Sequence, residues 1–186
     1  MGKQKEYGYD EAFKTLAKHF FIQFAKVITD YEIVNLPKKT DVLVIEADQP
    51  IREYVKVFDY FKRFNIIEFK SEVNTFRLEA DLPKILIYTG GILLNEKDAN
   101  LSNTTFTLVT SKKPDRLFTA FKNTIQKVKN GVYLIQGIVK TPVYIILVNE
   151  VEGELDQELA LLKGFATGEE KNWYIRAVVQ KSLTGN

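Results

Sequence analysis

The sequence predicts a mixed α/β domain, because segments with helical periodicity alternate along the chain with β-rich segments bounded by polar residues. The chain has 186 residues, which is long enough for one well-buried domain and short for two. Hydrophobic residues make up 45% and charged residues 27%, a balance typical of folded globular proteins rather than disordered ones. We therefore expect a single domain over residues 1–186.

The first half of the chain predicts one helix followed by three strands. Residues 10–28 carry apolar side chains at helical spacing, which predicts an amphipathic helix. A short strand is expected over residues 31–36, and β-rich runs predict stronger strands over 40–47 and 65–71. Residues 52–62 fit a short helix and an extended segment equally well. The apolar positions of the first helix are Phe13, Leu16, Ala17, Phe20, Phe24 and Val27.

A second helix is expected to begin at Asp81, with Pro83 in its first turn. Gly90 and Gly91 either end this helix or mark a close packing contact. The run "TTFTLVT" over residues 104–110 then predicts a strand.

The last third of the chain predicts a helix, two strands and further helices. A helix is expected from Pro114 to about Lys129, with the Asn130-Gly131 pair marking its end. The runs "GVYLIQGIV" and "VYIILVN" predict two strands that are joined tightly around residues 140–142. From Glu154 onward the pattern is mostly helical, with a break near Gly168 and a last helix that carries Trp173 on its core face.

Composition excludes several classes of site. The chain has no cysteine, which excludes disulfides, thiolate catalysis and cysteine-ligated zinc, and a single histidine, His19, excludes a multi-histidine metal site. No apolar run approaches the roughly 20 residues that span a bilayer, and the amino-terminal segment lacks the apolar core of a secretory signal. We therefore expect a soluble, cytoplasmic protein without a membrane partner. The net charge of +2 means that a nucleic-acid surface must come from local basic clusters.

Three charged residues are expected to converge at one end of a predicted hairpin. Side chains alternate between the faces of a strand, so Glu68 and Lys70 share one face while Ile67 and Phe69 share the other. The strand that begins at Asp41 is the natural antiparallel partner. In that pairing Asp41 lies opposite residues 68–70, within a cross-strand distance of about 5 Å.

These residue types suit phosphodiester hydrolysis. Two neighbouring carboxylates repel each other when both are ionised, and a divalent cation resolves that conflict. Mg²⁺ takes oxygen ligands, typically one or two carboxylates with retained water, and leaves room for a substrate phosphate. A nearby lysine can orient the attacking water or stabilise charge in the transition state.

The segments "LPKKTDVLVI" and "NIIEFKSE" resemble the PD-(D/E)XK nuclease superfamily. The resemblance implies a restriction-endonuclease-like core of helix, antiparallel three-strand meander, helix and strand over about residues 10–110, with a C-terminal extension over about 111–186. More narrowly, "YDEAFKTLAKHF", "TSKKPDRLF", "NGVYLIQGIV" and the spacing of Asp81, Lys84 and Tyr88 resemble the recombination-promoting nuclease branch, which is transposase-like.

This resemblance implies a metal-dependent DNA endonuclease. Asp41 and Glu68 would bind Mg²⁺, which Mn²⁺ could replace, with the Phe69 carbonyl as a third ligand and Lys70 as the catalytic lysine. Some relatives carry a Gln-x-x-x-Tyr pair on the following helix, where this chain has Lys84 and Tyr88. First-helix acids contribute in some members, so Asp10 is a further candidate; a helix N-cap is the simpler explanation for it.

Simpler explanations remain open for the other residues. Glu68 and Lys70 could be a salt-bridged pair on a solvent-facing strand, and Asp41 a turn residue before its strand. The 48–64 insertion is expected to cover the site or to join an interface such as a homodimer. A nuclease-like module that binds nucleic acid or protein without cutting is the alternative function. The basic residues expected on one helix, which form either a solvated face or a phosphate contact, are Lys112, Lys113, Arg116, Lys122, Lys127 and Lys129.

Overall fold

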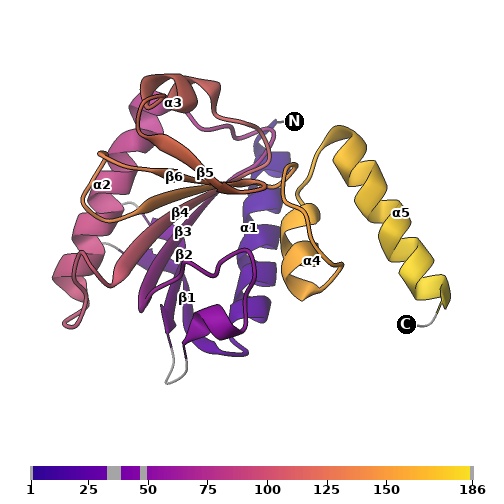
Figure 1. The fold of residues 1–186 in the computed structure, drawn as a ribbon, viewed down its shortest axis with the longest axis horizontal. Coiled ribbons are helices and arrows are strands. Elements are labelled where there is room, and N and C mark those ends of the chain that lie inside the picture. Colours follow the sequence, from indigo (N-terminus) through magenta and orange to yellow (C-terminus); the bar gives the residue numbers. More distant parts are fainter. Residues whose placement is uncertain (1, 33–38, 47–49, 185–186) are drawn as a thin grey trace.

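The computed structural model describes residues 2–32, 39–46 and 50–184, and these residues form a mixed α/β fold around one seven-stranded sheet (Figure 1). The helices are α1 (Gly2–Phe21), α2 (Leu78–Asn95), α3 (Asp115–Ala120), α4 (Gln157–Lys163) and α5 (Gly168–Thr184), with a short 3₁₀ turn, η1 (Ile51–Glu53). The strands are β1 (Ala25–Glu32), β2 (Lys39–Glu46), β3 (Phe64–Lys70), β4 (Thr104–Thr110), β5 (Ile125–Lys129), β6 (Val132–Ile135) and β7 (Val143–Leu147).

The sheet has the strand order β1-β2-β3-β4-β7-β6-β5. The strands β1, β2 and β3 form an antiparallel meander, and α2 then carries the chain back so that β4 runs parallel to β3. The strand β7 lies parallel to β4 and continues into the antiparallel pairs β7–β6 and β6–β5. The carboxyl ends of β3 and β4 therefore meet at one edge of the sheet.

Helices cover both faces of the sheet, with α1 and α4 on one face and α2 and α3 on the other (Figure 1). Alternation along β3 divides its side chains between these layers. Phe69 belongs to the core beneath α1, where its ring stacks on Phe13 with centroids 4.4 Å apart. Ile66 belongs to the core beneath α2, together with Ile85 and Tyr88. Each face of β3 is thus buried, which places any charged side chain of this strand in a poorly solvated environment.

The first helix is displaced relative to the sequence prediction of residues 10–28. The helix α1 begins at Gly2 and ends at Phe21, and Val27 lies in β1. The spacing of the apolar residues after Phe21 fits both a helix and a strand. The segment forms a strand because β1 pairs with β2 from Ala25 onward. Asp10 is consequently inside α1 and is not its N-cap. Of the short strand predicted over 31–36, residues 33–36 lie outside the described part of the chain.

The prediction of one helix from Pro114 to Lys129 is wrong. The helix α3 ends at Ala120, and residues 125–129 form β5. Asn130-Gly131 is the turn between β5 and β6, and Gly131 has a φ of 73° that a side chain would strain. The basic residues expected along one helix are therefore divided between the loop after β4, α3, the turn that follows α3, and β5.

The other strong predictions agree with the structure. The strands predicted over 40–47 and 65–71 correspond to β2 and β3, and residues 104–110 form β4. The helix expected from Asp81 begins three residues earlier, at Leu78, and runs through both glycines to Asn95. The prediction for Trp173 is wrong, because this side chain on the peripheral helix α5 is 44% exposed. No helix among the described residues is long and apolar enough to cross a membrane.

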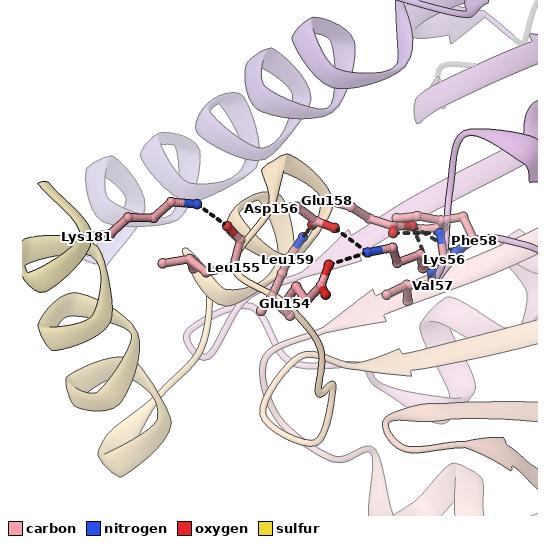
Figure 2. A network of polar contacts seen from close by, with 9 residues as sticks. All are labelled: Lys56, Val57, Phe58, Glu154, Leu155, Asp156, Glu158, Leu159 and Lys181. Atoms are coloured by element: carbon pink, nitrogen blue, oxygen red, sulfur yellow. Dashed lines mark hydrogen bonds and ion pairs between the residues drawn. The ribbon is translucent and has the colours of Figure 1, made fainter. Parts of the chain in front are cut away.

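The insertion is anchored to α4 by one buried carboxylate (Figure 2). Glu158 accepts hydrogen bonds from three consecutive backbone amides, those of Lys56 at 2.7 Å, Val57 at 2.9 Å and Phe58 at 3.0 Å. The side chain of Phe58 packs against Phe21 at the carboxyl end of α1. Because this segment precedes β3, it lies at the end of the strand opposite to Glu68 and Lys70. The described part of the insertion is therefore packed away from the candidate site.

Candidate functional site

The register of the meander brings Asp41 to Glu68. Val42 on β2 pairs with Ile67 on β3, so the preceding residue, Asp41, faces Glu68 at the next antiparallel position. Asp41 Oδ2 accepts a hydrogen bond from the backbone amide of Phe69 at 2.8 Å. The N–H and C=O groups of one strand residue point to the same side, so the Phe69 carbonyl is directed toward Asp41 as well. The arrangement predicted from alternation and antiparallel return is present.

Glu68 and Lys70 are buried beside each other on the face of β3 that α2 covers. Their side chains are only 9% and 5% exposed, and the Lys70 Nζ to Glu68 Oε1 distance is 3.7 Å. This burial is inconsistent with a salt bridge on a solvent-facing strand, because a surface pair keeps most of its hydration. Charges taken this far out of water require compensation by their neighbours.

That compensation comes from α2, which adds a carboxylate and a second ammonium one turn apart. Asp81 Oδ1 lies 3.2 Å from Lys70 Nζ and 2.8 Å from Lys84 Nζ. Lys84 Nζ also lies 3.9 Å from Glu68 Oε1. Two carboxylates and two ammoniums therefore form one network between β3 and the first turns of α2.

Tyr88 lies one turn beyond Lys84 and is 2% exposed. Its pKa is raised by burial, and the nearby charge of Glu68 raises it further. The tyrosine therefore remains protonated at neutral pH and lines the site as an uncharged side chain.

The carboxyl groups of Asp41 and Glu68 are both perturbed. Burial raises the pKa of Glu68 to about 8, and the charge of Asp41 acts in the same direction, against the opposing effects of Lys70 and Lys84. Burial also raises the pKa of Asp41 to about 6, opposed by the amide of Phe69, while Asp10 on α1 raises it further. The protein's own groups therefore do not fully stabilise the ionised forms of the Asp41 and Glu68 carboxyl groups.

The donor set fits a hard divalent cation. Glu68 Oε2 is buried and has no hydrogen-bond partner among the described residues, whereas Glu68 Oε1 faces the two lysines. Together with Asp41 and the Phe69 carbonyl, this oxygen would provide the small number of protein ligands that Mg²⁺ accepts alongside water. Among the described residues, no group of three or more His, Cys, Asp or Glu side chains is placed to hold a metal. A cation here would therefore depend on one carbonyl, water and substrate oxygens.

A pair of residues that the sequence did not reveal borders Asp41 on its other side. Asp30 falls between the paired positions Thr29–Val42 and Tyr31–Thr40, across from Asp41, where the β1–β2 ladder is interrupted and Asp30 has a left-handed φ of 53°. Its carboxylate is turned to Lys14 on α1, with the Lys14 Nζ to Asp30 Oδ1 distance at 2.7 Å. Lys14 in turn lowers the pKa of Asp41. The i, i+4 spacing of Asp10 and Lys14 on the first helix is a sequence signal that could have indicated this side.

Access to the site is greatest from Asp41 and Lys84. Asp41 is partly exposed, and the side chain of Lys84 is 22% exposed, while Glu68 and Lys70 lie deeper. A cavity of about 450 Å³ between α1 and β1 is lined by Lys14 and Asp30, but not by Asp41, Glu68, Lys70 or Lys84. A cavity of about 650 Å³ lies elsewhere, between α4 and α5, and contains none of these residues.

Comparisons with known protein families, functionally characterised proteins and solved structures give no significant match to this chain.

Proposed function

We propose that the protein is a metal-dependent DNA endonuclease that hydrolyses phosphodiester bonds in an active site formed by Asp41, Glu68 and Lys70. The observation that supports this proposal best is the pairing of Asp41 with Glu68 at adjacent strand ends, with the Lys70 ammonium 3.7 Å from Glu68. A buried pair of carboxylates is costly unless a cation or a bound proton neutralises it.

The element order also supports a finer assignment of the fold. The succession of α1, the β1–β3 meander, α2 and β4 is the order expected of a restriction-endonuclease-like core in the PD-(D/E)XK superfamily. We include this core, and the link to recombination or mobile elements that the sequence resemblance implies, in the proposal.

Each residue has a distinct role in the proposed reaction. Asp41, Glu68 and the Phe69 carbonyl would hold Mg²⁺ or Mn²⁺, which when bound supplies an activated water and neutralises charge on the phosphate. The amide of Phe69 orients the Asp41 carboxylate through its 2.8 Å hydrogen bond. The Lys70 ammonium provides a fixed positive charge for the attacking water or for the phosphate oxygens as their charge develops.

Cleavage assays test this proposal. The purified chain should cut plasmid or branched oligonucleotide DNA when Mg²⁺ or Mn²⁺ is present, and chelation should stop the reaction. Glu68→Gln and Lys70→Met should abolish cleavage with the fold intact, whereas Glu72→Gln, on the exposed segment after β3, should retain it. Cleavage that survives both active-site substitutions would refute the site assignment.

One observation favours a second candidate function, a nuclease-like module that binds nucleic acid without cutting. Lys70 is nearly fully buried and lies closer to Asp81 than to Glu68. A lysine held in this way could serve packing alone. This candidate predicts salt-sensitive DNA binding that neither metal nor Lys70→Met alters, with no cleavage by the wild-type protein.

A further inference from the structure

We propose that Asp81 is a positioning residue that holds the Lys70 and Lys84 ammoniums at the site as a pair, so that the site presents two lysines rather than one. This inference rests on the proposed nuclease function for its consequence, but its structural basis is independent of any metal.

One carboxylate oxygen serves both lysines. Asp81 Oδ1 lies 3.2 Å from Lys70 Nζ and 2.8 Å from Lys84 Nζ, in ion-pair contacts that do not have hydrogen-bond geometry. Two ammoniums this close to one point repel each other unless an anion lies between them. Glu68 can supply only the longer contacts of 3.7 and 3.9 Å. Asp81 is therefore the anion that lies closest to both ammoniums.

The second oxygen of Asp81 fixes its direction. Asp81 Oδ2 accepts a hydrogen bond from the Arg77 backbone amide at 2.7 Å, at the beginning of α2. The side chain of Asp81 is only 3% exposed, so it has no solvent to turn toward. A carboxylate anchored to the backbone in this way restricts the lysines more tightly than a flexible surface partner could.

The two lysines differ in depth, which assigns them different tasks. Lys70 is 5% exposed and lies beside Glu68, whereas Lys84 is 22% exposed and lies toward the opening of the site. Lys84 is therefore the ammonium that can meet a phosphate oxygen of an entering substrate, while Lys70 stays with the reacting groups. The two carboxylate oxygens of Glu68 also differ in their surroundings. Oε1 faces the two lysines, and Oε2 has no hydrogen-bond partner among the described residues.

Asp81→Asn is the direct test, because the amide keeps the size of the side chain and an oxygen for the Arg77 amide but removes the charge. Glu79→Gln is the matched control. It removes one charge from the first turn of the same helix, where Glu79 is exposed and pairs with Arg116. Circular dichroism and thermal melting establish that each variant is folded.

The first readout needs neither metal nor substrate. Lysine ammoniums held in ion pairs exchange their protons slowly and give ¹H–¹⁵N NMR signals, which Lys70→Met and Lys84→Met assign. We expect both signals in the wild type and in Glu79→Gln, and their loss in Asp81→Asn. The Lys70 signal should persist in Lys84→Met, because Asp81 is still present. Both signals persisting unchanged in Asp81→Asn would overturn the proposal.

The second readout is catalysis. Removing a partner that orients an active-site group typically lowers activity by about 10- to 100-fold. We expect Asp81→Asn to lower kcat by that amount with little change in KM, and Glu79→Gln to change neither. Equal kcat for the two variants would overturn the positioning role. A wild-type protein that does not cleave refutes the proposed function instead, and the NMR signals still decide the role of Asp81.

Discussion

The Asp41 carboxylate accepts a hydrogen bond from the Phe69 amide at 2.8 Å, which ties the beginning of β2 to the strand that carries Glu68 and Lys70. This contact joins a residue of the meander to the residue between the two proposed active-site side chains. It makes the position of Asp41 a property of the sheet itself rather than of a loop.

Metal binding should stabilise the protein measurably. At an ion concentration about 100-fold above its Kd, a bound ligand adds about 2.7 kcal/mol to the unfolding free energy, which raises Tm by about 5–10 °C in a chain of this length. We expect Mn²⁺ or Mg²⁺ to produce this shift in the wild type and in Glu72→Gln, but not in Asp41→Asn. An equal shift in Asp41→Asn would place the ion at another site.

Because the backbone of Asp30 is left-handed, we expect a glycine substitution at this position to be more stable than an alanine substitution. A residue with a Cβ pays about 1 kcal/mol for this conformation and glycine does not, so Asp30→Gly should be more stable than Asp30→Ala by about that amount. At Lys26, an exposed position of β1, the order should reverse, because glycine weakens an ordinary strand. Denaturant unfolding of the four variants measures both differences. The same order at both positions would contradict the expectation.

The pKa of Asp81 predicts how stability falls in acid. Burial alone would raise this pKa, but the contact with Lys84 and the Arg77 amide outweigh it and lower it below the ordinary value of 3.8. The stabilisation by ionised Asp81 is therefore present above about pH 4 and is lost as the pH falls through the lowered pKa. Asp81→Asn should be less stable than the wild type at pH 7, and the difference should shrink below pH 4. A difference that stays constant down to pH 2 would show that ionisation of Asp81 contributes nothing.

Glu158 should be among the most sensitive positions for stability. Truncating it leaves three amides of the insertion without their acceptor, and a buried donor left unpaired costs about 1–3 kcal/mol. We expect Glu158→Ala to lose roughly 3 kcal/mol or more, by denaturant unfolding. Glu154→Ala removes an exposed partner of Lys56 and should cost less than about 1 kcal/mol. Similar losses for the two variants would argue against the anchoring role.

The sequence was sufficient where one periodicity applied without competition. Alternation in "NIIEFKSE" and the antiparallel return from Asp41 predicted the meeting of Asp41, Glu68 and Lys70, and both strands were found close to their expected bounds. The prediction of one helix from Pro114 to Lys129 was wrong because the apolar residues from Leu117 to Val128 also fit a short helix followed by a strand. The Asn130-Gly131 pair, a typical hairpin turn, was the signal that could have separated these possibilities.

Long-range partners could not be predicted from spacing alone. The sequence indicated that Asp81, Lys84 and Tyr88 belong together on one helix, but only the packing of α2 on β3 brings Asp81 to Lys70. Asp30, which pairs with Lys14, has a left-handed φ, and no periodicity marks such a residue. The exposure of Trp173 follows from the peripheral place of α5, which no local pattern specifies.

The loop after β4 predicts where DNA would be held. The Ser111 amide donates to the Lys70 carbonyl at 3.0 Å, so the exposed Lys112 and Lys113 follow in the chain directly after a residue bonded to the proposed site, with the Lys113 ammonium 4.8 Å from the centre of the Phe118 ring. A hydrogen bond from Thr110 Oγ1 to the Lys112 carbonyl, at 2.7 Å, shapes this turn. These two lysines are therefore better placed for phosphate contacts than the other members of the basic group.

Metal-free DNA binding at several salt concentrations tests this placement. Each phosphate contact contributes about 0.7 to 0.9 to the slope of log K against log salt, so Lys112→Gln with Lys113→Gln should reduce the slope by about twice that. Lys122→Gln with Lys127→Gln removes the same charge from exposed positions beyond the loop and should leave the slope close to that of the wild type. If the two double variants reduced the slope equally, DNA binding would depend on the net charge of the protein and not on this edge of the sheet.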